Sequence, residues 1–165
     1  MATTALQGTP VHTNGELPAA GSKAPAFALV GQDLSAVDSS SFAGRTVVLN
    51  IFPSVDTGVC ATSVRKFNEK AASLPGVAVL CVSKDLPFAA GRFCGAEGIK
   101  NVVMGSGFRD DSFETAFGVK LVDGPLQGLM ARAVVVVGAD GVVKHSQLVP
   151  EITTEPDYAA ALGSI

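Results

Sequence analysis

The chain holds three cysteines and two histidines, and one of these cysteines lies where a reactive thiol is expected. Cys60 follows an apolar run, residues 46–52, that is typical of a buried strand, and it opens a segment whose apolar residues have helical spacing. If Asp56 or Thr57 is the N-cap, Cys60 lies in the first helical turn. Unpaired backbone N–H groups and the helix dipole favour a thiolate there.

The alternative for Cys60 is a small buried apolar residue, because unpaired cysteines are among the most buried residue types. The pattern Thr57-x-x-Cys60, directly after a strand and Pro53, shifts the balance toward reactivity without deciding it. A greater supply of thiolate accelerates an attack only modestly, so other groups must orient the electrophile and stabilise the leaving charge. We expect Thr57, nearby backbone N–H groups and an arginine to do so.

The other two cysteines do not form a framework with Cys60. An odd number of cysteines and the lack of a Cys-x-x-Cys pair argue against structural disulfides, and two distant histidines make a metal site unexpected. Cys81 lies within the apolar run 77–82 and is expected in the core. Cys94 lies in a predicted helix, 88–97, and its role stays open on this basis. No metal or cofactor is expected.

Length and composition favour a single folded domain, residues 1–165. The chain is 47% hydrophobic, and 12 basic against 15 acidic residues give a net charge of −3. The chain has no excess of basic residues to neutralise a phosphate backbone, so nucleic acid is not expected as a partner. No apolar stretch approaches the roughly 18 residues that span a bilayer, and the N-terminus lacks a leader pattern. We therefore expect a cytoplasmic protein that does not bind membranes.

Strand and helix patterns alternate along the chain in an order typical of an α/β fold. Residues 1–17 predict an N-terminal hairpin with its turn at Asn14-Gly15, and His12 on it is expected to be solvated. The continuous apolar runs 46–52 and 77–82 flank the Cys60 helix and predict a right-handed βαβ unit. Further elements are expected at 27–30, 36–37, 88–97, 102–104, 112–117, 133–137, 142–148 and in a last helix with Pro156 in its first turn.

This order matches a thioredoxin-like fold, with a central mixed sheet, flanking helices and the added hairpin. In that arrangement the strand 133–137 runs antiparallel to 46–52. It then begins at the sheet edge where the Cys60 loop leaves, which brings Arg132 near the sulfur. Arg65, on the Cys60 helix, is the next candidate. The alternative for Arg132 is a surface charge that bounds a buried strand.

The segment Pro53-Ser-Val-Asp-Thr57-Gly-Val-Cys60 resembles the Pro-x-x-x-Thr-x-x-Cys active-site motif of peroxiredoxins. Nearly the whole chain is similar to the bacterial thiol peroxidase subfamily, the atypical two-cysteine peroxiredoxins. The segments that carry this likeness are 65–68, 83–88, 92–94, 128–133 and 155–158.

The resemblance implies a thiol-dependent peroxidase that reduces hydrogen peroxide and organic hydroperoxides. Cys60 would be the peroxidatic cysteine and would form a sulfenic acid. Thr57 would hydrogen-bond the thiolate and the attacked oxygen, Arg132 would stabilise the thiolate and the leaving oxygen, and Pro53 would shield the pocket. Cys94 would be the resolving cysteine, and thioredoxin would reduce the resulting intrachain disulfide.

The resemblance also implies a homodimer that packs near the active-site loops, and an apolar pocket for bulky hydroperoxides. Phe52, Leu126 and Met130 are candidates to line that pocket. A disulfide requires Cα atoms within about 7 Å, yet Cys60 and Cys94 lie in separate predicted helices. We therefore expect at least one helix to unwind, with the glycine-rich helix 88–97 the weaker of the two.

The sequence leaves three alternatives to a peroxidase to be weighed. A thiol-disulfide oxidoreductase would need a Cys-x-x-Cys, but Cys60 is followed by Ala-Thr-Ser. A redox-sensing binding protein would oxidise once and signal to a partner, whereas a peroxidase turns over many equivalents of peroxide. A purely structural module would lose nothing when Cys60 is replaced by serine.

Overall fold

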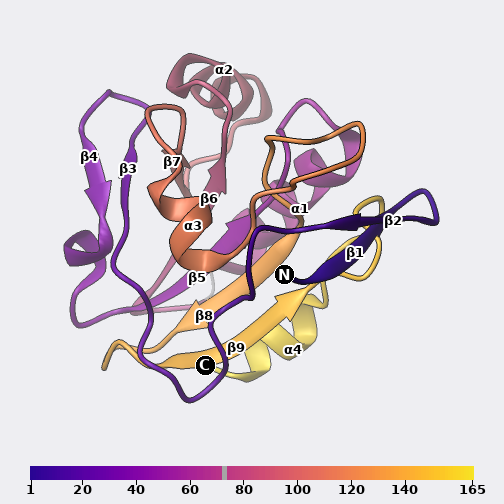
Figure 1. Ribbon diagram of the computed structural model, residues 1–165. Helices are drawn as coiled ribbons and strands as arrows, with labels where there is room; N and C mark the ends of the chain where they lie inside the picture. The colour runs from indigo at the N-terminus through magenta and orange to yellow at the C-terminus, as the bar shows by residue number, and fades with distance from the viewer. Residues whose placement is uncertain (72–73) are drawn as a thin grey trace.

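The computed structural model describes residues 1–71 and 74–165, which form a mixed sheet with helices on both faces and a separate hairpin (Figure 1). The elements in chain order are β1 (Thr3–Leu6), β2 (Thr9–His12), β3 (Ala28–Val30), β4 (Ala36–Asp38), the 3-10 turn η1 (Ser39–Phe42), β5 (Thr46–Ile51), α1 (Gly58–Ala71), β6 (Val77–Ser83), α2 (Pro87–Glu97), β7 (Val103–Ser106), α3 (Ser112–Phe117), β8 (Ala133–Val137), β9 (Val143–Leu148) and α4 (Tyr158–Gly163). No helix in these two ranges has the length and apolar character needed to cross a bilayer.

The large sheet has seven strands in the order β4-β3-β7-β6-β5-β8-β9 among the described residues. β5 runs parallel to β6, and β8 runs antiparallel to β5, so the predicted βαβ unit and the predicted direction of the last hairpin are confirmed. β5 and β8 are central and almost entirely apolar because helices cover both of their faces.

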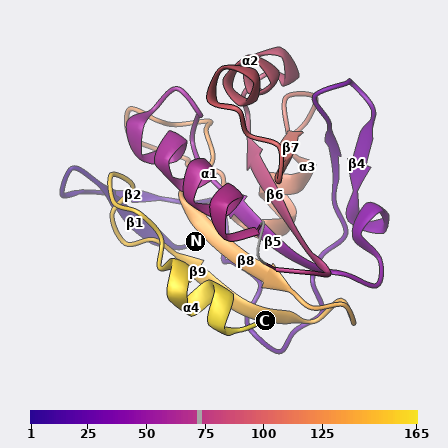
Figure 2. The same cartoon turned by 180° about the vertical axis from the view of Figure 1, so that it is seen from behind.

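Alternate side chains of the central strands point to opposite faces of the sheet. Val48 and Val134 pack with residues of α1, α2 and α4, and Figure 2 shows α1 and α4 lying on that face. Leu49 and Val135 face the other side, where Phe113 and Phe117 of α3 stack at 4.5 Å between ring centroids. The two faces therefore have separate apolar cores.

The N-terminal hairpin is confirmed, but its predicted turn is wrong. β1 and β2 pair directly, and the turn between them is Gln7-Gly8, where both residues have positive φ (51° and 81°). The side-chain pattern favoured Asn14-Gly15 because asparagine and glycine adopt positive φ most readily. The observed register pairs Leu6 with Thr9, which leaves Gln7-Gly8 as the two-residue turn.

Two local predictions near the hairpin and the C-terminus also need correction. The side chain of His12 is 38% exposed, but its Nδ1 lies 2.6 Å from Asp123 Oδ2, so it is paired and not simply solvated. The last helix begins at Tyr158, with the Asp157 side chain accepting a hydrogen bond from the Ala160 N–H. Pro156 therefore precedes the N-cap and is not in the first turn.

Candidate active site

Cys60 is the third residue of α1, in the first helical turn as predicted. The Thr57 carbonyl accepts the hydrogen bond from Ala61 N–H at 3.0 Å, so Thr57 has the N-cap position. The Cys60 carbonyl accepts a hydrogen bond from the buried Ser63 hydroxyl at 2.8 Å. The residue is 0% exposed, so any reactant reaches its sulfur only when neighbouring groups move.

Arg132 lies directly against this sulfur. Its Nη2 donates to Cys60 Sγ at 3.1 Å and its Nε donates to the Ile152 carbonyl at 2.7 Å. The third nitrogen, Nη1, is buried and has no hydrogen-bond partner among the described residues. The predicted proximity of Arg132 and Cys60 is thus confirmed, and the alternative of a surface charge is wrong because the residue is 2% exposed.

The charge of Arg132 requires a counter-ion. A guanidinium cannot lose its proton in a protein, and a buried charge is costly unless it is paired. None of the ion pairs within the described ranges includes Arg132. The pKa of the Glu155 carboxyl is lowered mainly by the hydrogen bond that the Tyr158 hydroxyl donates to it, then by its ion pair with Lys66, and least by the charge of Arg132. The side-chain atom in hydrogen-bond contact with the guanidinium among the described residues is the Cys60 sulfur.

The loop before α1 is held by one carboxylate. Asp85 accepts hydrogen bonds from the Ser54 hydroxyl at 2.7 Å and from Val55 N–H at 2.9 Å. Ser54 also stabilises the residues that follow it, because its carbonyl accepts a hydrogen bond from the Thr57 hydroxyl at 3.1 Å. Pro53 is buried at the start of this loop, whereas Thr57 is exposed. The Thr57 hydroxyl proton therefore points to Ser54 and not to the sulfur.

Asp85 was missed as a site residue in the sequence analysis, although a signal was present. It follows β6, and the carboxyl ends of the parallel strands β5 and β6 meet at one edge of the sheet. A polar residue just after β6 is thereby brought next to the loop that follows β5. Ile152 was missed as well, and it left no signal because it acts through its main-chain carbonyl.

The three cysteines are free, and each has a different environment. Cys94 lies three residues before the end of α2 and is 6% exposed, within the same apolar cluster as Cys60. Burial raises the pKa of its thiol. Cys81 is in β6 within the core, as predicted, and burial raises its pKa to about 12. No cluster of His, Cys, Asp and Glu suited to a metal ion occurs in the described part of the chain.

The structure places the three residues predicted to line an apolar pocket in three different apolar clusters, so it does not bring them together. Phe52 and Met130 are each 0% exposed and belong to different apolar clusters, on opposite faces of the sheet. Leu126 is partly buried and packs with a third cluster near the hairpin. Arg65 does not reach the sulfur, because its guanidinium pairs with Glu97 at 3.0 Å.

Comparison with known proteins places this geometry in a family. The Redoxin family profile matches residues 19–162. The thiol peroxidase of Mycobacterium tuberculosis is 60% identical over 165 residues, which is 100% of this chain and 99% of that protein. The thiol peroxidase of Corynebacterium glutamicum is 58% identical over the same coverage. A peroxiredoxin-like protein from Aquifex aeolicus has a similar crystal structure, with a TM-score of 0.93, 40% identity and coverage of 99% of this chain and 95% of that one.

Proposed function

The chain belongs to the Redoxin family, among its thiol peroxidases, and we propose that it reduces hydrogen peroxide and organic hydroperoxides at Cys60. The observation that carries this assignment is the state of Arg132. Its guanidinium is buried, one nitrogen contacts the sulfur, and a neighbouring nitrogen keeps an unpaired donor. Such a donor is suited to an oxygen atom that arrives beside the sulfur.

In the first step the Cys60 thiolate attacks the terminal oxygen of the hydroperoxide. A sulfur–oxygen bond forms and the oxygen–oxygen bond breaks, leaving a sulfenic acid and an alkoxide or hydroxide that takes up a proton. The Arg132 donors stabilise the negative charge that develops on the leaving oxygen. Preorganised donors in a buried site are effective because they need no reorganisation as the charge forms.

Thr57 and Pro53 complete the site in this proposal. While the Thr57 hydroxyl donates to the Ser54 carbonyl, its oxygen can accept a hydrogen bond from the O–H of the peroxide. The peroxide is then held between an acceptor and the Arg132 donors, with its terminal oxygen directed at the sulfur. Pro53 is buried at the start of the loop and limits the access of water.

In the second step the Cys94 sulfur attacks the Cys60 sulfenic acid. A disulfide forms within the chain and water leaves. A dithiol protein such as thioredoxin then reduces the disulfide by thiol–disulfide exchange, which returns both cysteines to thiols. Cys94 supports this role by its location in the last turn of α2, within the same apolar cluster as Cys60.

The test compares peroxide consumption by wild type, Cys60→Ser and Cys94→Ser, with thioredoxin, thioredoxin reductase and NADPH as the reducing system. We expect many turnovers for wild type and none for Cys60→Ser. Cys94→Ser should lack the intrachain bridge in non-reducing intact-mass spectra and should progress to the sulfinic acid under excess peroxide. Cys81→Ser serves as the matched control and should keep wild-type turnover.

The outcome also separates a peroxidase from the rival functions. A redox sensor would stop after about one equivalent of peroxide, whatever the reductant. A structural module would show no difference between wild type and Cys60→Ser. Full turnover by Cys60→Ser would contradict the proposal.

We further propose that the chain forms a homodimer whose interface lies near the active-site loops. Leu86 and Phe88, at the start of α2, are 51% and 67% exposed, and Phe108 is 39% exposed. The Ser106 hydroxyl bonds the Asp85 carbonyl, so the segments that carry these side chains lie together. Size-exclusion chromatography with light scattering should give a dimer for wild type. Phe88→Ser should weaken it, whereas Leu34→Ser, at another exposed apolar residue, should not.

A further inference from the structure

We propose that the N-terminal hairpin, β1 and β2, positions Arg132 for catalysis by holding residues 149–152 in place. This inference rests on the proposed role of Arg132 at Cys60. It assigns a function in the reaction to the hairpin, and it makes Thr4 a positioning residue that does not touch the reacting atoms.

Arg132 depends on the segment 149–152 for its orientation. Within residues 1–71 and 74–165 the guanidinium has one hydrogen bond other than its contact with sulfur, from Nε to the Ile152 carbonyl at 2.7 Å. The main chain of Arg132 is bound to the same segment, because its carbonyl accepts from Val149 N–H at 3.0 Å. A shift of this segment would therefore move the guanidinium relative to the sulfur.

Residues 149–152 follow the end of β9 at Leu148 and belong to no helix or strand. The hairpin supplies their missing hydrogen bonds. The buried Thr4 hydroxyl donates to the Val149 carbonyl at 2.7 Å, and Ile152 N–H donates to the Ala5 carbonyl at 2.8 Å. Ile152 thus has its N–H on the hairpin and its carbonyl on Arg132.

Apolar contacts reinforce these bonds. Val11 of β2 belongs to a buried cluster with Leu121, Ala131 and Ile152, each no more than 3% exposed. In Figure 1 the hairpin lies beside the arrowhead of β9, where the segment begins. This cluster includes Ala131, the residue before Arg132, and Ile152, whose carbonyl binds the guanidinium. The hairpin therefore supports both the main chain and the side chain of Arg132.

The test replaces the Thr4 hydroxyl and measures the two half-reactions separately. Thr4→Val keeps the shape and removes the donor, Thr4→Ser restores a hydroxyl, and Thr3→Val makes the same change on the exposed side of the same strand. The oxidative half-reaction is the second-order rate of Cys60 oxidation by hydrogen peroxide, followed by quenched intact mass. The reductive half-reaction is reduction of the preformed disulfide by dithiothreitol.

We expect Thr4→Val to slow oxidation on the order of tenfold, because small displacements of a catalytic donor have large effects on rate. Thr4→Ser should lie close to wild type, Thr3→Val should be unchanged, and none should alter the reductive rate. A merely structural role would not separate the two half-reactions. Equal oxidation rates for Thr4→Val and Thr3→Val would overturn the proposal.

A second variant covers the case in which Thr4→Val does not fold. Val11→Ala trims the apolar support without removing a hydrogen bond, and it should also slow oxidation selectively, whereas an unchanged rate would count against the proposal. Failure of the hairpin inference stays distinct from failure of the proposed function. In the first case wild type still turns over and Cys60→Ser does not, and in the second that contrast disappears.

Discussion

Arg65 of α1 holds Glu97, the last residue of α2, through two hydrogen bonds of 3.0 Å each. These bonds lower the pKa of the Glu97 carboxyl and raise that of Arg65. Cys94 lies in the same turn, and its carbonyl accepts hydrogen bonds from Gly98 and Ile99 N–H at the end of the helix. The ion pair therefore fastens the turn that must open if Cys94 is to reach Cys60.

Glu97→Gln should accelerate formation of the Cys60–Cys94 disulfide. The pair is partly exposed, so its loss should have a small effect, about two- to fivefold in rate. Rapid mixing with one equivalent of peroxide, followed by thiol blocking and intact mass, gives the rate. Glu69→Gln removes an exposed carboxylate from α1 and should leave it unchanged. An unaltered rate in Glu97→Gln would show that the pair does not limit the opening of α2.

Amide hydrogen exchange should reveal unwinding of α2 in the oxidised protein. The Cys60–Cys94 disulfide requires Cα atoms within about 7 Å, and the two cysteines lie in separate helices. Gly91 and Gly95 make α2 the weaker of these helices. We expect residues 88–97 to exchange faster in the oxidised than in the reduced state, while β5 stays protected. Oxidised Cys94→Ser provides the control without the bridge. Equal protection of 88–97 in both states would contradict the prediction.

The sequence predicted the central elements because each leaves a strong local signal. The apolar runs of β6 and β8 are continuous, and that of β5 is interrupted only by Asn50, since both faces of these strands are covered. The parallel direction of β5 and β6 follows from the helix that connects them, and the antiparallel direction of β8 from the match of the element order to a thioredoxin-like fold. The register of β8 on β5 then brings Arg132 to Cys60. Proximity across the sheet could therefore be derived without coordinates.

What the sequence could not predict depends on contacts between distant segments. The turn of the N-terminal hairpin lies at Gln7-Gly8, and Thr4 and Ala5 of the hairpin bind residues 149–152; no local pattern records such long-range contacts. The direction of the Thr57 hydroxyl follows from the Ser54 carbonyl, and a side-chain rotamer of this kind is set by its surroundings.

Cys81→Ala should keep full peroxidase activity with a small loss of stability. Its thiol is buried in β6 and its pKa is raised to about 12, so it stays protonated and inert at neutral pH. Removing the sulfur leaves a small cavity beside Asn50, whose Nδ2 lies 3.7 Å from it. We expect a loss of about 1 kcal/mol and a fall in Tm of about 2–4 °C. Calorimetry and steady-state kinetics test both, and a large loss of turnover would give Cys81 a role in the reaction.

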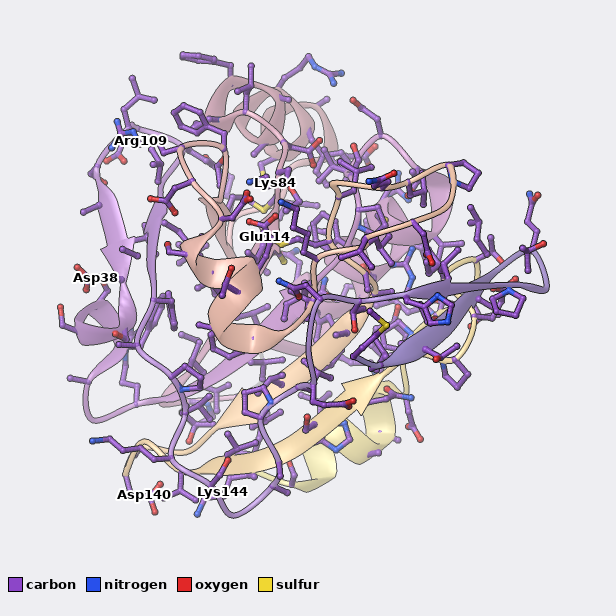
Figure 3. All side chains as sticks on the ribbon, viewed as in Figure 1. Asp38, Lys84, Arg109, Glu114, Asp140 and Lys144 are labelled. Carbon is purple, nitrogen blue, oxygen red and sulfur yellow. The ribbon has the colours of Figure 1, made fainter. Side chains whose placement is uncertain are left out.

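Lys84→Met should destabilise the fold in a pH-dependent manner. Lys84 Nζ lies 3.1 Å from the carboxylate of Glu114, which is 0% exposed, and the two side chains lie together in Figure 3. Burial raises the pKa of Glu114 above its ordinary 4.5, and Lys84 partly offsets that rise. Without Lys84 the buried carboxylate is unpaired, so we expect a loss of about 3 kcal/mol at neutral pH.

The sign of this pH dependence follows from the raised pKa. The folded state binds the Glu114 proton more tightly than the unfolded state, so its contribution is present below pH 4.5 and is lost as the pH rises through the folded pKa. Urea unfolding of Lys84→Met should therefore show a free energy of unfolding that falls from about pH 4.5 toward neutrality, more steeply than in wild type. Lys144→Met, at an exposed pair with Asp140, should follow the wild-type curve. Parallel curves for Lys84→Met and wild type would mean that the pair does not control this titration.

Arg132→Lys should slow oxidation of Cys60 on the order of a hundredfold, although the charge is kept. Lysine is a single point charge, whereas the guanidinium has three separate nitrogens. Nη2 donates to Cys60 Sγ, Nε donates to the Ile152 carbonyl, and Nη1 has a donor that no described residue accepts. An ammonium group cannot serve all three, so the attacked peroxide loses a donor even if the thiolate keeps a counter-ion. The second-order rate of oxidation by hydrogen peroxide measures the effect, with Arg45→Lys, at an exposed arginine, as the control. If Arg132→Lys kept the wild-type rate, charge alone would suffice, and the geometry of the guanidinium would have no part in the reaction.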